Sequence, residues 1–433
     1  MTSIAALPGF LFFLLLTVSP LQAQSHLLLD GGRLIDGTGR APIDDIQILI
    51  KGNLIKGNRI ERVGTRGSFE APAGTRRIDT AGKTILPGFV DPHFHIADDV
   101  TMVPLFVANG VTSARDPGAW MELFEPVKQW QRQHSIPAPR LFLCGPHLDG
   151  PNPAYPTDSI VILSPEEARL AVRRQVAQGA TAIKVYFRLP LESIRAAAGE
   201  AHRLRVPVTA HLEVIDVRDA VEAGIDGVEH ITSLGTALIP PMEAEKYRQQ
   251  ILADNGARRE GRYRMWASID PHSKAAADLA RSLAERKIFV DPNLAVFERR
   301  SEANQENNDI KVRATKNMKE YVGVLHRAGV PIVVGSHSNA QYAPRGFAFH
   351  REMETLVEAG LTPMETLVAA TKIGARFFQR ENDLGTVEEG KLADILVLDR
   401  DPLASISNTR SISTIVVDGQ VLDPKAVPPL AKP

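Results

Sequence analysis

Between residues 87 and 380 the chain alternates strand-like apolar runs with helical runs about eight times, and this alternation limits its fold most. The run Ile183-Lys-Val-Tyr186, for example, precedes a helical pattern at 191–203 and then another strand-like run at 206–211. Repeated strand–helix–strand units favour parallel pairing, and about eight of them close into a barrel. The sequence therefore predicts an α/β fold, a (β/α)8 TIM barrel.

The two ends of the chain differ from this pattern, because short strands and glycine-rich turns replace the helices. Residues 24–86 and 383–433 share this character, so we predict that they form the two parts of one small composite β-sandwich. The barrel then occupies residues 87–382. Residues 231–272 are too long for a simple connection, and a helix is predicted at 242–254. Such an insertion would cover the mouth of the barrel as a lid.

The N-terminal segment has the pattern of a targeting signal. Residues 9–18 are apolar and uncharged, and Pro20 and the small residue Ala23 follow them. This stretch is too short to span a bilayer comfortably and is typical of a cleaved export signal. An uncleaved anchor is the alternative, because residues 1–7 carry no Lys or Arg. We expect residues 1–23 to be a signal peptide and the protein to be exported, either to the periplasm or as a secreted protein.

Composition excludes several classes of partner. The chain has 433 residues, is 44% hydrophobic and 23% charged, and carries a formal net charge of −1. Because the positive and negative charges nearly balance, the sequence shows no excess of basic residues for binding nucleic acid, and none for a membrane surface once the signal is removed. The single cysteine, Cys144, cannot form an internal disulfide or a thiolate metal cluster. A homo-oligomer stays compatible with the sequence.

Candidate metal ligands lie at the ends of the predicted strands. His93 and His95 are two residues apart, a spacing that places both side chains on one face of a strand. Lys184, His211 and His230 lie on the fourth, fifth and sixth predicted strands. The carboxyl ends of barrel strands meet at one mouth, where active sites lie. Imidazole nitrogen suits zinc and neighbouring divalent metals, so the sequence predicts a divalent metal site, with zinc as the first candidate.

These residues stand in motifs that resemble those of the amidohydrolase superfamily, and in particular its imidazolonepropionase/prolidase-like (Xaa-Pro dipeptidase-like) branch. The resemblance extends from about residue 26 to 423. It rests on Pro87-Gly-Phe-Val-Asp-Pro-His-Phe-His95, Ile183-Lys-Val-Tyr186, Ala210-His211, Val228-Glu-His-Ile231 and the long segment 384–398. It implies a metal-dependent hydrolase of amide or cyclic-amide C–N bonds, with a short peptide or another small molecule as substrate.

The resemblance also implies roles for individual residues. His93 and His95 would bind a buried metal, a carboxylated Lys184 would bridge two metals, and His211 and His230 would bind the more exposed ion. Burial and nearby cations favour a neutral lysine amine, which can add carbon dioxide. Tyr186 is the candidate for substrate contact, although on a regular strand it would face away from Lys184 unless the strand bends. One ion or two are both compatible with these residues.

The pattern departs from the family at the eighth strand. The family expects an aspartate there as general base, whereas this chain has Gly335-Ser-His-Ser338, with His337 at the aligned position. Three hypotheses remain open: a hydrolase with His337 as catalytic base, a hydrolase that uses Asp291 or Asp116 instead, and an exported metal- or ligand-binding protein with impaired catalysis. Glu229 is expected to face away from the ligands and to orient a loop.

Overall fold

The computed structural model describes residues 26–52, 58–301, 308–427 and 430. The predicted signal peptide, residues 1–23, lies outside the described residues. Within those ranges, every helix is too short or too polar to traverse a lipid bilayer.

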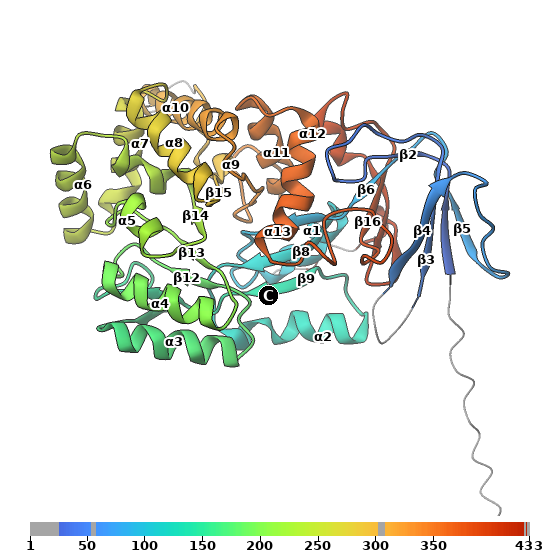
Figure 1. Cartoon of the computed structure of the whole chain (residues 1–433), viewed down its shortest axis with the longest axis horizontal. Coiled ribbons are helices and arrows are strands. Elements are labelled where there is room, and N and C mark those ends of the chain that lie inside the picture. Colours follow the sequence, from blue (N-terminus) through green and yellow to red (C-terminus); the bar gives the residue numbers. More distant parts are fainter. Residues whose placement is uncertain (1–25, 53–57, 302–307, 428–429, 431–433) are drawn as a thin grey trace, which may run out of the picture.

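The middle of the chain forms the predicted (β/α)8 barrel (Figure 1). Its strands pair in parallel: β7 (Phe89–Asp91), β8 (Val111–Asp116), β9 (Arg140–Leu143), β10 (His147–Asp149), β12 (Ile183–Val185), β13 (Val208–Ala210), β14 (Gly227–Glu229) and β15 (Phe289–Asp291). Thr181 donates a backbone hydrogen bond to Leu143 at 2.8 Å, so β9 and β10 together serve as the third strand. Residues 331–335 take the eighth position through a parallel bridge between Val290 and Ile332.

Helices follow most of the barrel strands, and most of these helices cover the outside of the barrel. They are α1 (Val103–Ala108), α2 (Glu125–Gln133), α3 (Pro165–Ala177), α4 (Leu191–Arg203), α5 (Val217–Glu222), α8 (Lys274–Glu285), α9 (Leu294–Phe297), α10 (Asn308–Arg327), α11 (Ala348–Glu358), α12 (Pro363–Val368) and α13 (Gly374–Phe377). The start of α3 shows why the sequence folds this way. The Ser164 hydroxyl accepts a hydrogen bond from the Glu167 backbone N–H at 3.2 Å, which caps an otherwise unpaired helix donor.

The chain ends form a β-rich domain beside the barrel, to the right in Figure 1. One sheet has the order β4-β3-β1-β5, with β1 (His26–Asp30), β3 (Ile46–Lys51), β4 (Arg59–Thr65) and β5 (Arg76–Asp79). The other has the order β18-β17-β16-β6-β2, with β2 (Arg33–Leu34), β6 (Thr84–Pro87), β16 (Ile395–Leu398), β17 (Ile412–Val417) and β18 (Gln420–Leu422). Pairing of β6 with β16 joins the two ends of the chain. A buried cluster that includes Ile48, Ile85 and Val397 fills the space between the sheets, so the predicted composite sandwich is confirmed.

The long insertion after β14 lies over the carboxyl ends of the barrel strands. It contains η3 (Ile231–Ala237), α6 (Pro241–Ala253) and α7 (Ala257–Ser268). Tyr247 of α6 donates a hydrogen bond to Glu213, beyond β13, at 2.9 Å. Arg258 of α7 donates to the Tyr155 hydroxyl at 2.7 Å. Through these contacts the insertion reaches the residues around the candidate ligands.

Candidate metal centre

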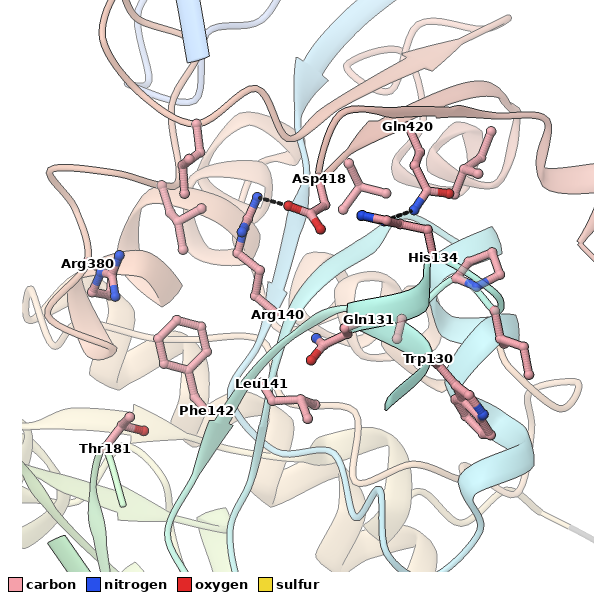
Figure 2. A pocket seen from close by; sticks show the side chains of 17 residues that line it. Trp130, Gln131, His134, Arg140, Leu141, Phe142, Thr181, Arg380, Asp418 and Gln420 are labelled. Atoms are coloured by element: carbon pink, nitrogen blue, oxygen red, sulfur yellow. Dashed lines mark hydrogen bonds and ion pairs between the residues drawn. The ribbon is translucent and has the colours of Figure 1, made fainter. Parts of the chain in front are cut away.

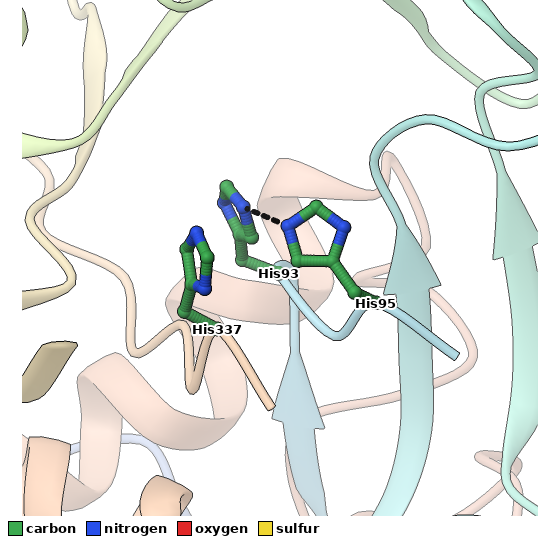
Figure 3. A group of neighbouring side chains, drawn as sticks. All are labelled: His93, His95 and His337. Atoms are coloured by element: carbon green, nitrogen blue, oxygen red, sulfur yellow. Dashed lines mark hydrogen bonds between the residues drawn. The ribbon is translucent and has the colours of Figure 1, made fainter. Parts of the chain in front are cut away.

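Three histidines gather where the first and eighth strands meet (Figure 3). His93 and His95 follow β7, and their Nε2 atoms lie 3.2 Å apart. The His337 ring centroid lies 5.0 Å from that of His93 and 4.7 Å from that of His95. The His337 backbone N–H donates to the His93 carbonyl at 2.7 Å, and His337 has a left-handed φ of 53°. This local turn directs the imidazole into the barrel mouth beside the other two.

His211 and His230 extend this group across the mouth. Each directly follows its strand, His211 after β13 and His230 after β14, and their ring centroids are 4.5 Å apart. The His230 ring lies 4.8 Å from that of His93 and 5.2 Å from that of His337. The structure therefore brings together all five predicted imidazoles in one continuous group.

Lys184 lies on β12 and lines the same cavity as the histidines, and its side chain is 2% exposed. It forms an ion pair with Glu229, whose other carboxylate oxygen accepts from Arg115 Nη2 at 2.6 Å. The expectation that Glu229 faces away from the ligands is therefore wrong. The reason is local: His230 has a positive φ of 65°, which interrupts the strand alternation and lets consecutive residues both face inward.

Asp291, at the end of β15, also faces the histidines. Its Oδ2 lies 3.1 Å from His93 Nδ1, and Glu229 Oε2 lies 3.2 Å from the same nitrogen. A carboxylate at this position favours the His93 tautomer with the proton on Nδ1. The lone pair is then on Nε2, the atom that faces His95. Asp116, the other acid considered from the sequence, accepts backbone N–H bonds from Gly118 and Ala97 at 2.9 and 3.2 Å.

Burial keeps the histidines neutral. It lowers the pKa of His95 to about 4, of His211 to about 4 and of His337 to about 3, with neighbouring cationic groups adding to the shift in each case. The pKa of His93 and the pKa of His230 fall well below the ordinary value for the same reason. Neutral imidazoles present lone pairs, which is the form that binds a metal.

The nitrogen and oxygen atoms of these side chains are suited to binding a cation. Among the described residues, the buried Nδ1 atoms of His211 and His230 have no hydrogen-bond partner. His211 Nε2 lies 3.1 Å from Glu213 Oε1, so this carboxylate fixes the orientation of the ring. The lone pair of Nδ1 is then available to a metal ion. The ligand atoms of His93, His95 and His337 form one group within 4.8 Å of one another, and those of His93, Glu229 and His230 form a second.

A cavity of about 130 Å³ opens beside these side chains. Its lining includes His95, Lys184, Tyr186, His230 and His337. Tyr186 lies one residue beyond the end of β12, so the alternation that would turn it away from Lys184 no longer applies. Its ring centroid is 4.8 Å from that of His211. Tyr186 therefore lies where a molecule in the cavity can contact it.

A larger cavity, of about 390 Å³, lies between the barrel and the β-rich domain (Figure 2). It lies beside the start of β9 at Arg140, whereas active sites of such barrels lie at the carboxyl ends of the strands. Arg140 pairs with Asp394 at 3.1 Å and approaches Asp418 at 3.6 Å. Its charge is therefore already balanced, and the arrangement joins the two domains.

Sequence reasoning missed several residues of the site. Glu213 is two positions after His211, the same spacing that identified His93 and His95, so this signal was present. His147 begins β10, the second part of the third strand position, and lines the cavity, with its ring centroid 4.7 Å from that of Tyr186. Arg258 comes from the insertion, and no local pattern connects it with the strand ends.

The fold and the site together place this chain in the class of (β/α)8 barrels with a candidate metal site at the carboxyl ends of the strands. Comparison with known proteins identifies the family. The amidohydrolase family model matches residues 84–422, so this chain belongs to the amidohydrolase family. Ochratoxinase of Aspergillus niger is 26% identical over 258 residues, which is 56% of this chain and 45% of that protein. Imidazolonepropionase of Haloarcula marismortui is 33% identical over 97 residues, 22% of this chain and 23% of that protein.

The likeness to solved structures extends over nearly the whole chain. A prolidase complexed with N-methylphosphonate-L-proline superposes with a TM-score of 0.70 at 22% identity, covering 92% of this chain and 100% of that one. The matches to curated relatives, in contrast, span less than half the length of each, 45% for ochratoxinase and 23% for imidazolonepropionase. The amidohydrolase resemblance read from the sequence is thus confirmed, and a prolidase and an imidazolonepropionase are among the similar proteins.

Proposed function

We propose that this protein is a metal-dependent hydrolase of amide or cyclic-amide C–N bonds. The observation that carries the proposal is the gathering of five neutral imidazoles and one buried lysine at the barrel mouth, with unpartnered nitrogens on His211 and His230. Similarity to a prolidase and to ochratoxinase supports a short peptide or another small molecule as the substrate.

His93, His95, Lys184, His211 and His230 would hold one or two divalent ions, with zinc as the first candidate. Imidazole nitrogen with a small number of oxygen donors is the ligand set that zinc prefers. When bound, the ion supplies Lewis acidity toward the scissile carbonyl and toward a water nucleophile. The chain's own contribution is the fixed donor geometry, since Asp291 holds the His93 ring and Glu213 holds the His211 ring.

Lys184 would serve as a bridging anion after carboxylation. Burial lowers the pKa of its ammonium, although the Glu229 carboxylate opposes the shift. A neutral amine forms a bond to carbon dioxide and loses one proton, which gives a carbamate with two donor oxygens. Incorporation of 13C-labelled bicarbonate, followed by 13C NMR of the metal-loaded protein, tests this step, and Lys184→Arg should abolish the signal.

His337 and Tyr186 would act on the substrate. His337 faces His93 and His95 and lines the cavity, so one of its ring nitrogens is positioned to accept a proton from a water molecule there. Tyr186 is protonated, because burial raises its pKa well above the ordinary value, and its hydroxyl can donate to a substrate oxygen. Asp291 is the alternative base, but its carboxylate is already engaged by His93.

The test is hydrolysis by the metal-loaded protein of a panel of dipeptides, N-acyl amino acids and cyclic amides. His211→Ala should reduce kcat/KM by more than the roughly 10- to 100-fold that loss of a supporting partner costs. His272→Ala is the matched control, because its side chain is 62% exposed and lies on the surface. Equal activity of His211→Ala and wild type would contradict the proposal.

A second candidate function is an exported protein that binds metal or a small ligand without turnover. The observation that favours it is the closeness of His337 to His93 and His95, which suits a third ligand as well as it suits a base. His337→Asp distinguishes the two candidates. A gain of hydrolysis in His337→Asp, with an inactive wild type, supports impaired catalysis, whereas an active wild type excludes it.

Export is a separate proposal, and it rests on residues 1–23 of the sequence alone. Expression of the full chain and of a form that starts at residue 24 should place only the full chain outside the cytoplasm. N-terminal sequencing of the exported protein should then begin at residue 24. A protein that keeps residues 1–23 and stays membrane-bound would instead support the uncleaved anchor.

A further inference from the structure

A buried carboxylate joins the two loops that carry the tyrosines of the cavity. Asp149 is the last residue of β10 and is 0% exposed. Its Oδ1 accepts the backbone N–H groups of Gly150 and Arg188, both at 2.9 Å, and its Oδ2 accepts that of Ala154 at 3.1 Å. Both carboxylate oxygens are therefore engaged by backbone donors. Through them Asp149 links the loop after β10 to the turn after β12.

Each of the two linked segments carries one tyrosine that lines the cavity. Tyr155 directly follows Ala154, and Tyr186 lies two residues before Arg188. The two tyrosine rings meet edge to face, with their centroids 5.8 Å apart. Burial raises the pKa of Asp149 to about 6, while the backbone hydrogen bonds oppose the shift, so the carboxylate is ionised at pH 8. Because hydrogen bonds to an ionised group are stronger than neutral ones, these contacts set how the two tyrosine segments lie against each other.

The backbone packs closely at this junction. A Cβ at Gly150 would lie 2.1 Å from the Arg188 carbonyl oxygen, so the approach of the two segments requires glycine. The Arg188 side chain extends the link to the insertion, because its Nη2 donates to the Ile251 carbonyl and to Asn255 Oδ1, both at 2.7 Å. The Ile251 carbonyl belongs to the last turn of α6, where carbonyls have no partner within the helix. The loop, the turn and the insertion are thus held together beside the cavity.

We propose that Asp149 is a positioning residue, which sets the places of the Tyr155 and Tyr186 side chains at the cavity through the two segments that it links. The inference rests on the proposed function, because these side chains matter as contacts for a substrate of that site. Asp149 is not among the described residues that line the cavity, so it acts through the tyrosines and not by touching the substrate.

The kinetic test uses Asp149→Asn in the metal-loaded full chain at pH 8. Asparagine keeps the shape of the side chain but replaces one acceptor oxygen with an N–H donor, which cannot accept the bond from a backbone N–H. The variant should lower kcat/KM for an amide substrate by about 10- to 100-fold and raise KM, because a displacement of ~1 Å costs up to this much. Asp270→Asn is the matched control, since this exposed aspartate also accepts a backbone N–H, that of His272 at 2.9 Å, and it should keep the wild-type kcat and KM.

A mutant cycle separates positioning from a general loss of structure. In the Tyr155→Phe/Tyr186→Phe background the hydroxyls that Asp149 positions are absent. Asp149→Asn should then lower kcat/KM by no more than about twofold further. The same 10- to 100-fold loss in this background would overturn the inference, as would a loss in kcat alone with KM unchanged.

A spectroscopic test needs neither turnover nor metal, so it distinguishes failure of this inference from failure of the proposed function. The protein is labelled with 3-fluorotyrosine, and Tyr155→Phe and Tyr186→Phe assign two of its 19F NMR signals. In Asp149→Asn both signals should move, whereas that of Tyr321, which donates to the Ala276 carbonyl at 3.2 Å, should stay. Movement of both supports the inference even if no amide in the panel is hydrolysed, and two unchanged signals overturn it.

Hydrogen exchange of the wild type keeps the inference testable if Asp149→Asn does not fold. Peptides that cover residues 150–158 and 186–190 should be protected from exchange although both lie in connecting segments, because Asp149 engages their amides. Rapid exchange of the Ala154 or Arg188 amide would overturn the inference.

Discussion

Replacing Glu213 with glutamine tests whether the chain orients a metal-binding imidazole through a carboxylate. Glu213 is 1% exposed, lies 3.1 Å from His211 Nε2 and accepts from the Tyr247 hydroxyl at 2.9 Å. Burial alone would raise its pKa, but the His211 hydrogen bond and the charges of Arg262 and Arg258 hold the pKa at about 2. The carboxylate is therefore ionised at neutral pH and keeps the proton of His211 on Nε2.

Glutamine in this position removes the charge and can donate an N–H to His211. The imidazole proton would then shift toward Nδ1, the atom that we propose binds the metal. Loss of such a supporting partner costs about 10- to 100-fold in metal affinity, or about 1.4 to 2.7 kcal/mol. Tyr247→Phe removes a single hydrogen bond to Glu213 and keeps the charge, so its effect should be smaller than 10-fold.

The assay is competition for zinc between each variant and a chromogenic chelator, with thermal unfolding of the metal-free proteins to confirm that they are folded. Glu245→Gln is the matched control, because this α6 glutamate has a side chain that is 57% exposed. Its affinity should equal that of the wild type. If Glu213→Gln binds zinc as tightly as the wild type, the proposed role of Glu213 and of His211 Nδ1 is refuted.

Three further predictions concern the surrounding structure. A Cβ at Gly118 would lie 2.0 Å from His147 Nε2. Gly118→Ala should therefore displace the imidazole, lower kcat/KM and reduce the free energy of unfolding in urea by about 1–3 kcal/mol. Gly199→Ala is the control, because its Cβ would meet no atom within 4 Å and the substitution should cost no stability. Burial raises the pKa of Glu352 to about 7, so its contribution to stability is complete below the unfolded pKa and is lost as pH rises through 7. Relative to Glu352→Gln, the wild type should therefore lose on the order of 3 kcal/mol of unfolding free energy between pH 5 and 8, and a constant difference would contradict this reasoning. Zinc at 100 times its dissociation constant should stabilise the wild type by about 2.7 kcal/mol in calorimetric unfolding but should leave His211→Ala unchanged, and equal stabilisation of both would place the ion elsewhere.

The sequence predicted the barrel and the strand-end residues because both follow from local patterns. His93, His95, His211 and His230 directly follow apolar runs, and the barrel topology brings the carboxyl ends of parallel strands together. Position along the chain is then enough to predict that these side chains meet. The ligand roles of the individual residues stay predictions, since proximity alone does not assign them.

The directions of two side chains could not be read in this way. Alternation predicts opposite faces for neighbouring residues, but His230 has a positive φ and Tyr186 lies beyond the end of β12. Glu229 therefore faces the lysine, and Tyr186 faces the same cavity as Lys184. The contact of Arg258 with Tyr155 could not be predicted for a different reason. The two residues are 103 positions apart in the sequence, and only the packing of the insertion brings them together.

The central claim is that His93, His95, Lys184, His211 and His230 hold a shared divalent cation cluster. Anomalous diffraction from crystals of the zinc-loaded protein, collected on both sides of the zinc absorption edge, tests it most directly. The account predicts one or two zinc peaks among these five side chains, with His211 bound through Nδ1. Zinc peaks at any other place, with these imidazoles unbound, would contradict it.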